Sequence, residues 1–339
     1  MLKMILRAAF AASAAGMLLA PTGATADPTN LRLSFFTSDR SQIYRALIKP
    51  YVDAVNDDGG EFVHIEVFFS GAISGVQSRQ PQLVSDGTAD LALVVPGRTP
   101  ERFHDTSVLE LPGLFRNSLE GSRVFTQLLG DNVLSGYPDF YVVAGMVSGP
   151  ENVHSRKPIA SLAELKGLRI RVNNQIEAEV LGRLGAVPVL LAINQTTEAM
   201  SSGAIDGATA PPSMLFEFGI SRVATYHYMI GLGGVPVALL MNRKRFESLP
   251  LQAQTIIRKY SGEWLSDHAA TQFDAWDSEV VKTLEADQRR TVTFPNDADT
   301  ARIKEVYADV IKDYADSSDR NSDLFARVRA DVAKQRAAE

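Results

Sequence analysis

The 339-residue chain contains no cysteine, so neither disulfide bonds nor thiol chemistry can contribute to its stability or function. It also has no run of about 20 apolar residues, the length that a membrane-spanning helix needs. The longest such run, from Ala8 to Ala20, is shorter. We therefore expect a mature chain that is soluble and does not itself span a membrane.

Common enzyme signatures are also missing. The sequence has no HExxH, no GxSxG, no phosphate-binding P-loop, and no pair of histidines at the helical spacing of metal ligands. The histidines are dispersed, which is typical of surface or hydrogen-bonded core residues: His64, His104, His154, His227 and His268. We expect no enzyme, no cofactor and no metal centre.

The first 26 residues differ from the rest. Lys3 and Arg7 precede the apolar run, and Ala24-Thr25-Ala26 supplies small residues at a cleavage position, as in a cleaved secretory signal peptide. An uncleaved anchor or a buried helix is the alternative. The leader carries two of the positive charges, so the formal net charge moves from −6 to −8 without it. A chain this acidic is not expected to bind nucleic acid.

Short apolar runs alternate with helical stretches along the remaining chain, and this pattern predicts an α/β fold with parallel strands covered by helices. A helix is expected after the cap Asp39. The expected strands of the first half are Leu31–Phe36, Val63–Val67, Ala89–Val95 and Tyr141–Val147. A second block predicts strands 168–172, 187–191, 205–208 and 235–242, with helices 175–184 and 195–202. Such a length usually splits into two domains.

Two further segments carry structural predictions. From Leu251 to about Asp287 the sequence has no proline and only one glycine, Gly262, which favours a long helix that spans both lobes. Its aromatic stripe, Trp264, Phe273 and Trp276, is more typical of lobe packing than of ligand contact. The segment from Gly231 to Pro236 nearly matches a dinucleotide-binding fingerprint, but a strand rather than a helix follows it, so we interpret it as a turn.

The segment from Pro158 to Asn173 is the most informative. It predicts a strand with Arg169 and Arg171 on one face, and an arginine at the end of such a strand points into the crevice where α/β sheets bind ligands. A guanidinium can hold a carboxylate through two parallel charge-assisted hydrogen bonds. From the pattern alone, solvated positions at a strand edge are favoured for both arginines over a role in ligand binding.

Eight segments occur in a characteristic order: Phe68–Gly75, Leu83–Asp90, Leu111–Phe115, Leu165–Val172, Gly185–Pro188, Gly203–Gly207, Met241–Arg243 and Ser248–Pro250. In order and spacing they resemble the solute-binding subunits of tripartite ATP-independent periplasmic (TRAP) transporters, the DctP-type family, over essentially the whole mature chain. The resemblance implies a periplasmic protein with two α/β lobes (a type II-like binding fold) joined by crossing strands and one long helix, with the solute buried between the lobes.

On this resemblance, the first lobe takes residues 27–148 plus about 237–276, and the second takes 149–236 plus about 277–339. The family's most consistent ligand group is an arginine that pairs with a carboxylate, and its motif position here is Arg171. Arg169 then falls at a variable basic position, on the surface or in support of the strand. The first-lobe loop after strand Ala89–Val95 makes Val95 and Arg98 candidates, although Arg98 is equally compatible with a merely exposed position.

The sequence departs from the family at two polar positions. Members that bind sialic acid often place a second arginine where this chain has Glu151, and many have Glu-Asn where it has Thr209 and Ala210. Further candidate ligand contacts are Phe35, Phe36, Ile193, Thr209, Pro211 and Met214, which predict a pocket charged at one end and otherwise apolar. His154 or Asn173 is a candidate for recognising a hydroxyl or keto group, though His154 fits a scaffold role better.

The predicted ligand is therefore a small monocarboxylate with an apolar or aromatic body, captured by hinge closure and delivered to TRAP membrane subunits. Two rivals stay open. One is an exported α/β enzyme that uses Asp206 and a histidine as acid and base, and the other is a ligand-binding module for a sensor protein. The sequence leaves open whether the protein is a monomer or a dimer joined through its long helix.

Overall fold

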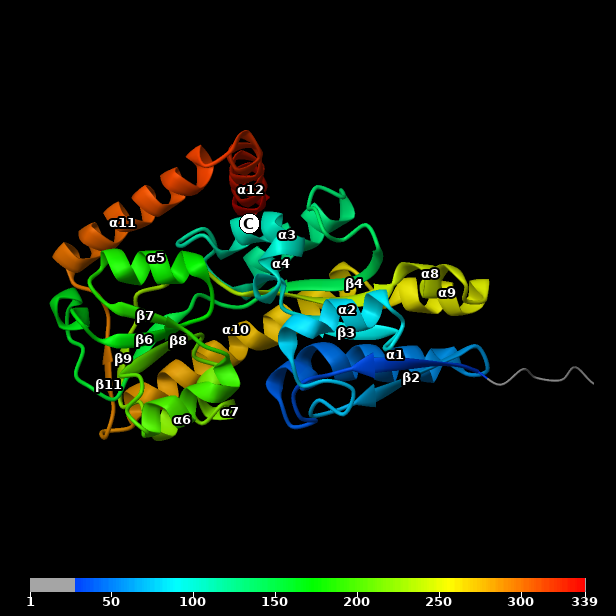
Figure 1. Ribbon diagram of the computed structural model, residues 1–339, viewed down its shortest axis with the longest axis horizontal. Coiled ribbons are helices and arrows are strands. Elements are labelled where there is room, and N and C mark those ends of the chain that lie inside the picture. Colours follow the sequence, from blue (N-terminus) through cyan, green and yellow to red (C-terminus); the bar gives the residue numbers. More distant parts are fainter. Residues whose placement is uncertain (1–27, 339) are drawn as a thin grey trace, which may run out of the picture.

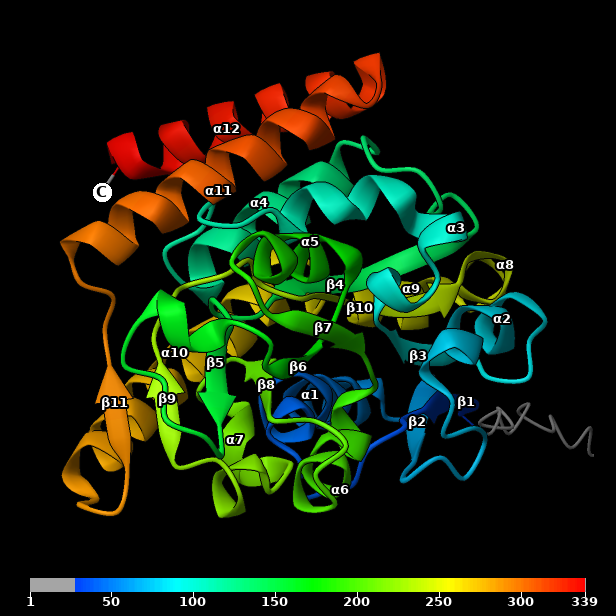
Figure 2. The same ribbon diagram turned by 60° about the vertical axis from the view of Figure 1, so that its left-hand side comes forward.

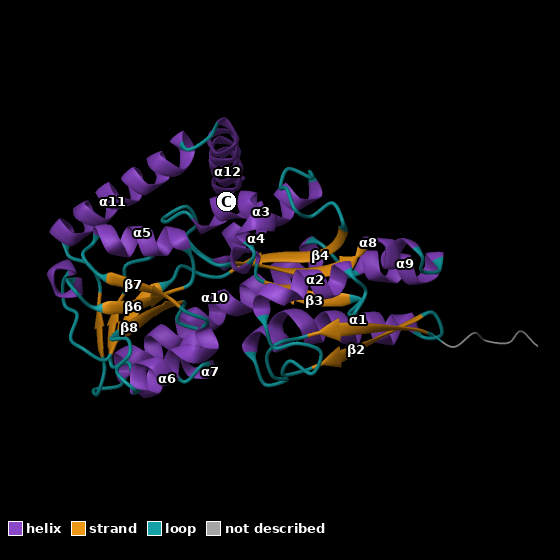
Figure 3. Ribbon diagram, viewed as in Figure 1, coloured by secondary structure: helices purple, strands orange, loops and turns teal. Residues whose placement is uncertain are grey.

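A computed structural model describes residues 28–338, which form two lobes that are each built on one mixed β-sheet (Figures 1 and 3). The predicted two-lobe α/β architecture is confirmed. The predicted leader over residues 1–26 lies outside the described residues.

The first sheet has five strands, in the spatial order β2 (Val63–Phe68), β1 (Thr29–Ser34), β3 (Leu91–Val94), β10 (Pro236–Asn242) and β4 (Phe140–Val147). β1 is parallel to both β2 and β3, as predicted, but β10 is antiparallel to β3 and β4. The predicted parallel pairing therefore holds for β1, β2 and β3, while β10 and β4 make the sheet mixed. β4 leaves the first lobe at the cleft and β10 re-enters there, so the returning strand must run in the opposite direction.

The second sheet has six strands, in the order β11 (Thr291–Thr293), β9 (Tyr226–Tyr228), β5 (Asn152–Ser155), β8 (Gly207–Ala210), β6 (Arg169–Val172) and β7 (Val187–Leu190). β6 is parallel to β7 and β8, whereas β5 is antiparallel to β8 and β9. The chain passes directly from the first lobe into β5, and β5 therefore runs opposite to β8 and β9.

The two chain crossings between the lobes lie side by side. The Ser148 amide donates to the Val235 carbonyl at 3.0 Å, and the Val235 amide donates to Ser148 Oγ at 2.9 Å. A Cβ atom on Gly233 would lie 2.0 Å from the carbonyl oxygen of Glu110, and one on Gly234 would lie 2.4 Å from that of Ser148. The glycine-rich segment that we interpreted as a turn is thus an interlobe crossing, where backbones approach too closely for any side chain.

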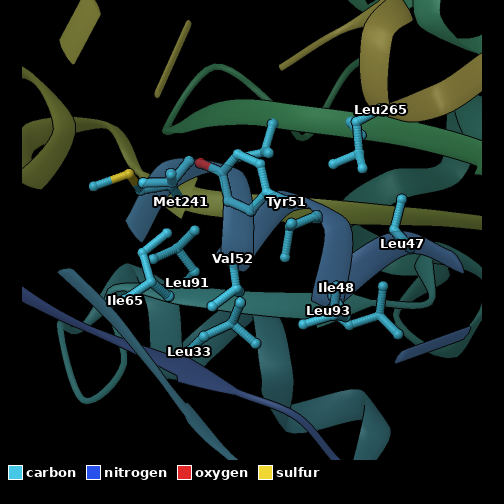
Figure 4. Packing of buried hydrophobic residues seen from close by; sticks show 14 of the residues in the cluster. Leu33, Leu47, Ile48, Tyr51, Val52, Ile65, Leu91, Leu93, Met241 and Leu265 are labelled. Carbon is cyan, nitrogen blue, oxygen red and sulfur yellow. The ribbon is translucent and has the colours of Figure 1, made fainter. Parts of the chain in front are cut away.

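The core of the first lobe packs helix against sheet (Figure 4). Alternate residues of β1 and β2 are buried, and one face of α1 (Lys49–Gly59), together with the π-helical segment Tyr44–Ile48 before it, packs on them. The stripe has helical spacing: Leu47, Ile48, Tyr51, Val52 and Val55. The helical segment begins near Ser41, whose Oγ accepts from the Tyr44 amide at 3.2 Å, rather than at the predicted cap Asp39.

The predicted helix from Leu251 to about Asp287 is in fact two helices, α9 (Leu251–Lys259) and α10 (Glu263–Ala286). Gly262 separates them with a φ of +68°, a conformation that favours glycine. The 24 residues of α10 span about 36 Å and run from one lobe to the other (Figure 1). Phe273 is buried in the first lobe and Leu284 in the second, while Trp264 is 45% exposed.

Two C-terminal helices, α11 (Asp297–Asp316) and α12 (Asp319–Ala338), lie side by side across the top of both lobes in Figure 2. α11 buries Val306 and Val310 in the core of the second lobe, but α12 buries Leu324 and Val328 in a core of the first. The predicted division of the chain placed both helices in the second lobe. Together with α10 they connect the lobes away from the cleft.

The other helices are short and cover the sheets. In the first lobe they are α2 (Gln80–Ser85), α3 (Pro100–Phe103), α4 (Ser118–Gly130) and α8 (Arg243–Glu247). In the second lobe they are α5 (Gln175–Arg183), α6 (Thr196–Ser201) and α7 (Met214–Glu217). The 3₁₀ turns are Gln77–Arg79, Pro96–Arg98, His104–Glu110, Leu162–Leu165, Ile193–Gln195 and Ile220–Arg222.

Candidate functional site

The candidate site lies between the lobes, at the carboxyl ends of β3 and β6. The 3₁₀ turn Pro96–Arg98 follows β3 in the first lobe, and Asn173 follows β6 in the second. Open α/β sheets bind their ligands at this end of the strands. Hydrogen bonds already cross the cleft here, so the structure has its lobes in contact.

Arg171 is the largest fully buried side chain, with 1% of its surface exposed. Its guanidinium donates to three neutral acceptors, the carbonyls of Leu191 at 2.8 Å and Thr209 at 3.0 Å and the amide oxygen of Asn173 at 2.9 Å. Burial lowers the pKa of Arg171, and the nearby carboxyls of Glu151 and Glu177 oppose that shift. A guanidinium has five N–H donors, so one donor on each Nη remains available.

Arg98 reaches the same point from the opposite lobe. Its Nη2 donates to Asn173 Oδ1 at 2.8 Å and to the Leu191 carbonyl at 3.3 Å, and its buried Nε has no hydrogen-bond partner among the described residues. Burial, and next the charge of Arg171, lower the pKa of Arg98. Two like-charged guanidiniums thus share two neutral oxygens, Asn173 Oδ1 and the Leu191 carbonyl, an arrangement that an anion would stabilise.

Glu177 is buried beside the arginines but is engaged elsewhere. Its carboxylate accepts from the Asn173 amide at 3.0 Å, Thr209 Oγ1 at 2.6 Å and Asn174 Nδ2 at 3.2 Å. The Asn174 side chain in turn accepts from the Glu177 amide at 2.8 Å, so the two residues cap α5 reciprocally.

Two more buried carboxyls adjoin the cleft, Glu151 and Glu110, which are 2% and 5% exposed. Burial, and next the charge of Glu177, raise the pKa of Glu110 to about 8. The same two causes raise the pKa of Glu151 well above its usual range. The raised pKa values of Glu110 and Glu151 favour their uncharged forms beside the guanidiniums of Arg98 and Arg171, which suits an anionic ligand.

A cavity of about 100 Å³ opens beside Asn173. Its walls are mainly apolar, and the lining side chains come from both lobes: Phe36, Ile43, Leu93, Val95, Met146, Ile193, Pro211, Met214, Phe218, Val235 and Val237. The polar lining includes Glu151, Asn173 and Glu217. An apolar cavity of about 150 Å³ holds benzene, so the cavity between these closed lobes is smaller than one ring and suits a small ligand.

The predicted contacts therefore divide into two groups. The structure brings these six to the wall of the cavity: Phe36, Val95, Asn173, Ile193, Pro211 and Met214. Arg171 and Arg98 lie behind Asn173 rather than on the wall, and Arg98 lines a neighbouring hollow with Gln77 and Asn194.

Phe35, Thr209 and His154 do not reach the cavity wall. Phe35 is fully buried in the first lobe, where its ring centroid lies 6.0 Å from that of Phe36. It is directed inward because successive side chains near a strand end face opposite sides. Thr209 is buried on β8, where its carbonyl accepts from Arg171 and its hydroxyl donates to Glu177. It therefore supports the site from behind.

His154 forms a buried pair with His227, with 2.8 Å between their Nδ1 atoms, and His154 Nε2 lies 3.1 Å from the Ala210 carbonyl. Burial lowers the pKa of His154 to about 4 and, together with the neighbouring His154, that of His227 to about 3. The bonds assign the Nε2 proton of His154 to Ala210 and the shared Nδ1 proton to His227. The neutral pair joins β5 to β9 as scaffold.

The other conspicuous polar cluster is at the protein surface. Asp206 accepts from the Arg169 amide at 3.0 Å and pairs with Lys157 at 2.8 Å and Arg169 at 3.3 Å. Burial opposes its ionisation, but these hydrogen bonds outweigh it and hold the pKa of Asp206 below its usual range. Asp206 is therefore unsuited to the acid–base role considered for it, and Arg169 has the supporting position expected of it.

Among the cavity-wall residues that sequence reasoning missed are two acidic ones. Glu151 was noted only as the place of an absent arginine. Glu217 was not singled out, yet its Oε2 accepts from the Gln42 amide at 2.7 Å across the cleft. Gln42 and Glu217 are 175 residues apart, and no local pattern could have indicated their contact.

Two lobes, two adjacent antiparallel crossings and a bridging helix, with a cavity between the lobes, define a two-lobe solute-binding protein. Residues 33–317 match the model of the family "Bacterial extracellular solute-binding protein, family 7", the DctP family. The chain belongs to this family, whose members are periplasmic solute-binding receptors of TRAP transporters rather than enzymes. No helix among residues 28–338 is long and apolar enough to cross a membrane.

Solved structures of TRAP solute-binding proteins are similar over nearly their whole length. A protein from Rhodoferax ferrireducens with copurified benzoate is 25% identical, with a TM-score of 0.85 over 92% of this chain and 100% of that one. A marine metagenome protein specific for aromatic acids, in complex with metahydroxyphenylacetate, is 23% identical, with a TM-score of 0.85 over 90% and 99%.

One relative is similar over almost its full length. The ectoine/5-hydroxyectoine-binding periplasmic protein UehA of Ruegeria pomeroyi is 22% identical over 340 residues, which cover 95% of this chain and 96% of UehA. The likeness therefore extends over both lobes, while the solutes bound by such relatives differ in chemistry.

Proposed function

We propose that this chain captures a small organic monocarboxylate with an apolar or aromatic body and delivers it to TRAP membrane subunits. The observation that carries the proposal is the pair Arg98 and Arg171, which share the neutral oxygen of Asn173 at 2.8 and 2.9 Å. A ligand carboxylate that replaces this oxygen would give both guanidiniums an anionic partner. Charge-assisted hydrogen bonds of this kind are worth about 1.5–3 kcal/mol each.

The character of the cavity supports a monocarboxylate. A second carboxylate on the ligand would face apolar side chains or the carboxyls of Glu151 and Glu217, and an unpaired buried charge is strongly unfavourable. Phe36, Ile193 and Met214 would instead contact an apolar body. The neighbours crystallised with benzoate and metahydroxyphenylacetate are consistent with this class of ligand.

Closure of the lobes would couple capture to delivery. Arg98 belongs to the first lobe and Asn173 and Arg171 to the second, so a ligand held by both arginines stabilises the closed state over the open one. The closed protein would then be the form that docks on the membrane subunits. A leader over residues 1–26 would bring the chain to the periplasm, and sequencing the N-terminus of the secreted protein tests its cleavage.

Calorimetry with benzoate, phenylacetate, succinate and glucuronate tests the ligand class. We expect stoichiometric binding of the aromatic monocarboxylates without product formation, and a loss of at least about 2 kcal/mol in Arg171→Ala. Preferential binding of succinate or glucuronate would disprove the monocarboxylate class, and full affinity in Arg171→Ala would disprove the site. Uptake by vesicles that contain TRAP membrane subunits, with and without the protein, tests delivery and separates transport from a sensor role.

A further inference from the structure

Glu151 is a buried acidic residue in the wall of a cavity that is proposed to bind an anion. It lies on the crossing between β4 and β5, where its carbonyl accepts from the Leu232 amide at 2.8 Å and its amide donates to Gly233 at 3.3 Å. Its side chain lines the cavity, and its Oε2 has no hydrogen-bond partner among the described residues. The backbone thus fixes a polar group that has an unfilled hydrogen-bonding site.

The surroundings of Glu151 favour its uncharged form. Glu177 accepts from three donors, the Asn173 amide, Thr209 Oγ1 and Asn174 Nδ2. The Glu151 carboxyl faces Glu177 itself, a contact that raises its pKa, and among the described residues it shares only the Thr209 hydroxyl as a donor. Arg171 donates to neutral acceptors, and within residues 28–338 neither Arg171 nor Arg98 forms an ion pair with Glu151. Two neighbouring buried carboxyls do not readily both ionise, so the proton resides on the one with fewer donors. That one is Glu151.

We propose that Glu151 is a specificity-determining residue which, as a neutral carboxylic acid, binds a hydroxyl group of the organic acid held by Arg98 and Arg171. A neutral carboxyl carries one O–H donor and one C=O acceptor, and a hydroxyl can satisfy both. The inference rests on the proposed function, because the arginines must hold the ligand carboxylate. It narrows the ligand class to hydroxylated monocarboxylates.

An ammonium group on the ligand would instead require an ionised Glu151, because an ammonium group donates hydrogen bonds and accepts none. An ionised Glu151 would put a negative charge in the cavity wall and oppose the attraction of Arg98 and Arg171 for the ligand carboxylate. A neutral Glu151 adds no such repulsion. We therefore assign a hydroxyl to this position, and binding of an amino acid in its place is an outcome that the experiment separates.

The proposal predicts a dependence of affinity on pH. Burial and the charge of Glu177 raise the pKa of Glu151, against the opposing effect of Arg171. Other titratable groups pack around the same crossing, Glu110 near Arg98 and Asp277 against Gly149. An anionic ligand raises the pKa of Glu151 further, so binding takes up a proton. Affinity then falls as pH rises through the pKa of Glu151 in the free protein, approaching a tenfold loss per pH unit.

Matched acids test the hydroxyl contact. Benzoate is compared with 2-, 3- and 4-hydroxybenzoate, and phenylacetate with mandelate and phenylglycine, by calorimetry in the full mature chain. We expect one hydroxy acid to bind about tenfold more tightly than its parent. Glu151→Gln, which keeps a donor and an acceptor, should keep the preference, and Glu151→Leu should lose it. Glu198→Gln, at an exposed position on α6, is the control for a lost carboxyl in the same lobe.

The results separate the two proposals. If no aromatic monocarboxylate binds, the proposed function fails. If they bind but no hydroxy acid is preferred, or Glu151→Leu keeps the preference, the assignment of Glu151 fails alone. Tighter binding of phenylglycine than of mandelate would overturn the neutral form in favour of a carboxylate that binds an ammonium group.

The charge state of Glu151 is also measurable without any ligand. The infrared band of a protonated carboxylic acid, recorded at neutral pH in the free protein, should weaken in Glu151→Gln and persist in Glu198→Gln. Glu110→Gln distinguishes the band of Glu110 from that of Glu151, because this variant should keep the infrared contribution of Glu151. If the pH dependence of binding vanishes in Glu110→Gln but not in Glu151→Gln, or if Glu151 gives no protonated band, the proposal is wrong.

Discussion

Arg169 and Arg171 are two residues apart on β6, yet the chain surrounds them in opposite ways. Arg169 is at the surface, where Asp206 supplies a carboxylate to it and to Lys157. Arg171 is fully buried, and its partners are two carbonyls and an amide oxygen that Arg98 shares. Asp206 forms ion pairs with its basic neighbours, whereas no carboxylate among residues 28–338 forms an ion pair with Arg98 or Arg171. This difference is the reason why we assign Arg169 to the stability of the fold and propose Arg171 as a ligand contact.

The largest effect is expected when a carboxylate is introduced between the two arginines of the cleft. In Asn173→Asp, a carboxylate replaces the amide oxygen between Arg98 and Arg171. We expect ligand affinity to fall at least about a hundredfold, because a bound carboxylate would meet a like charge. The ligand-free variant should be closed and thermally more stable than the wild type. Calorimetry, small-angle scattering and melting curves measure these effects.

The gain in stability should require both arginines. In an Arg98→Ala background, Asn173→Asp should no longer stabilise the protein, since only one guanidinium would face the new carboxylate. An Asn173→Asp variant that still bound its ligand tightly would place the anion site elsewhere.

Replacing each of the two arginines of β6 by lysine, in separate variants, tests whether only the buried one contributes to ligand binding. Arg171→Lys keeps the charge but loses the fork that bonds Leu191, Thr209 and Asn173, so we expect ligand affinity to fall about thirtyfold, or about 2 kcal/mol. Arg169→Lys should change affinity by less than about 0.5 kcal/mol, because Arg169 is half exposed and remote from the cavity. If the two variants lost ligand affinity equally, the assignment of ligand binding to the buried arginine alone would be wrong.

Much of the fold followed from periodicity, because each lobe repeats simple strand–helix units. The direction of β10 and β5 did not, since it depends on where the chain crosses between lobes. The break at Gly262 was also missed, although the glycine itself was visible. Its positive φ and the bond from its amide to the Val143 carbonyl arise only in the folded chain.

The site was partly predictable for a similar reason. Arg171 and Asn173 are close in sequence on one strand end, so a local pattern indicated both. Arg98 was recognised only as a candidate, because its contact with Asn173 joins residues 75 positions apart. Phe35 and Phe36 were indistinguishable in sequence, and the pleat of the strand end decided which of them reaches the cavity.

Removing the carboxylate of Asp206, which is buried beneath Lys157 and Arg169, provides the reverse test. Asp206→Asn leaves Lys157 and Arg169 without their carboxylate and should lower the free energy of unfolding by about 1.5 kcal/mol at neutral pH. Because the folded pKa of Asp206 is depressed, this contribution is complete above the usual aspartate pKa of about 3.9 and is lost as pH falls below it. Urea unfolding across this pH range measures the difference, and ligand affinity at neutral pH should not change.

The smallest expected effect concerns the contact of Glu217 with the Gln42 amide, the other hydrogen bond that crosses the cleft beside the cavity. Glu217→Gln weakens a charge-assisted bond that forms only when the lobes meet, so it should shift the equilibrium toward the open state. We expect ligand affinity to fall about fivefold, or about 1 kcal/mol, with Glu198→Gln as the control. Because the bond is absent from the open state, the loss should appear mainly as faster ligand release in stopped-flow measurements. A slower association with unchanged release would instead assign Glu217 to ligand entry, leaving the two arginines as the contacts that hold the lobes together.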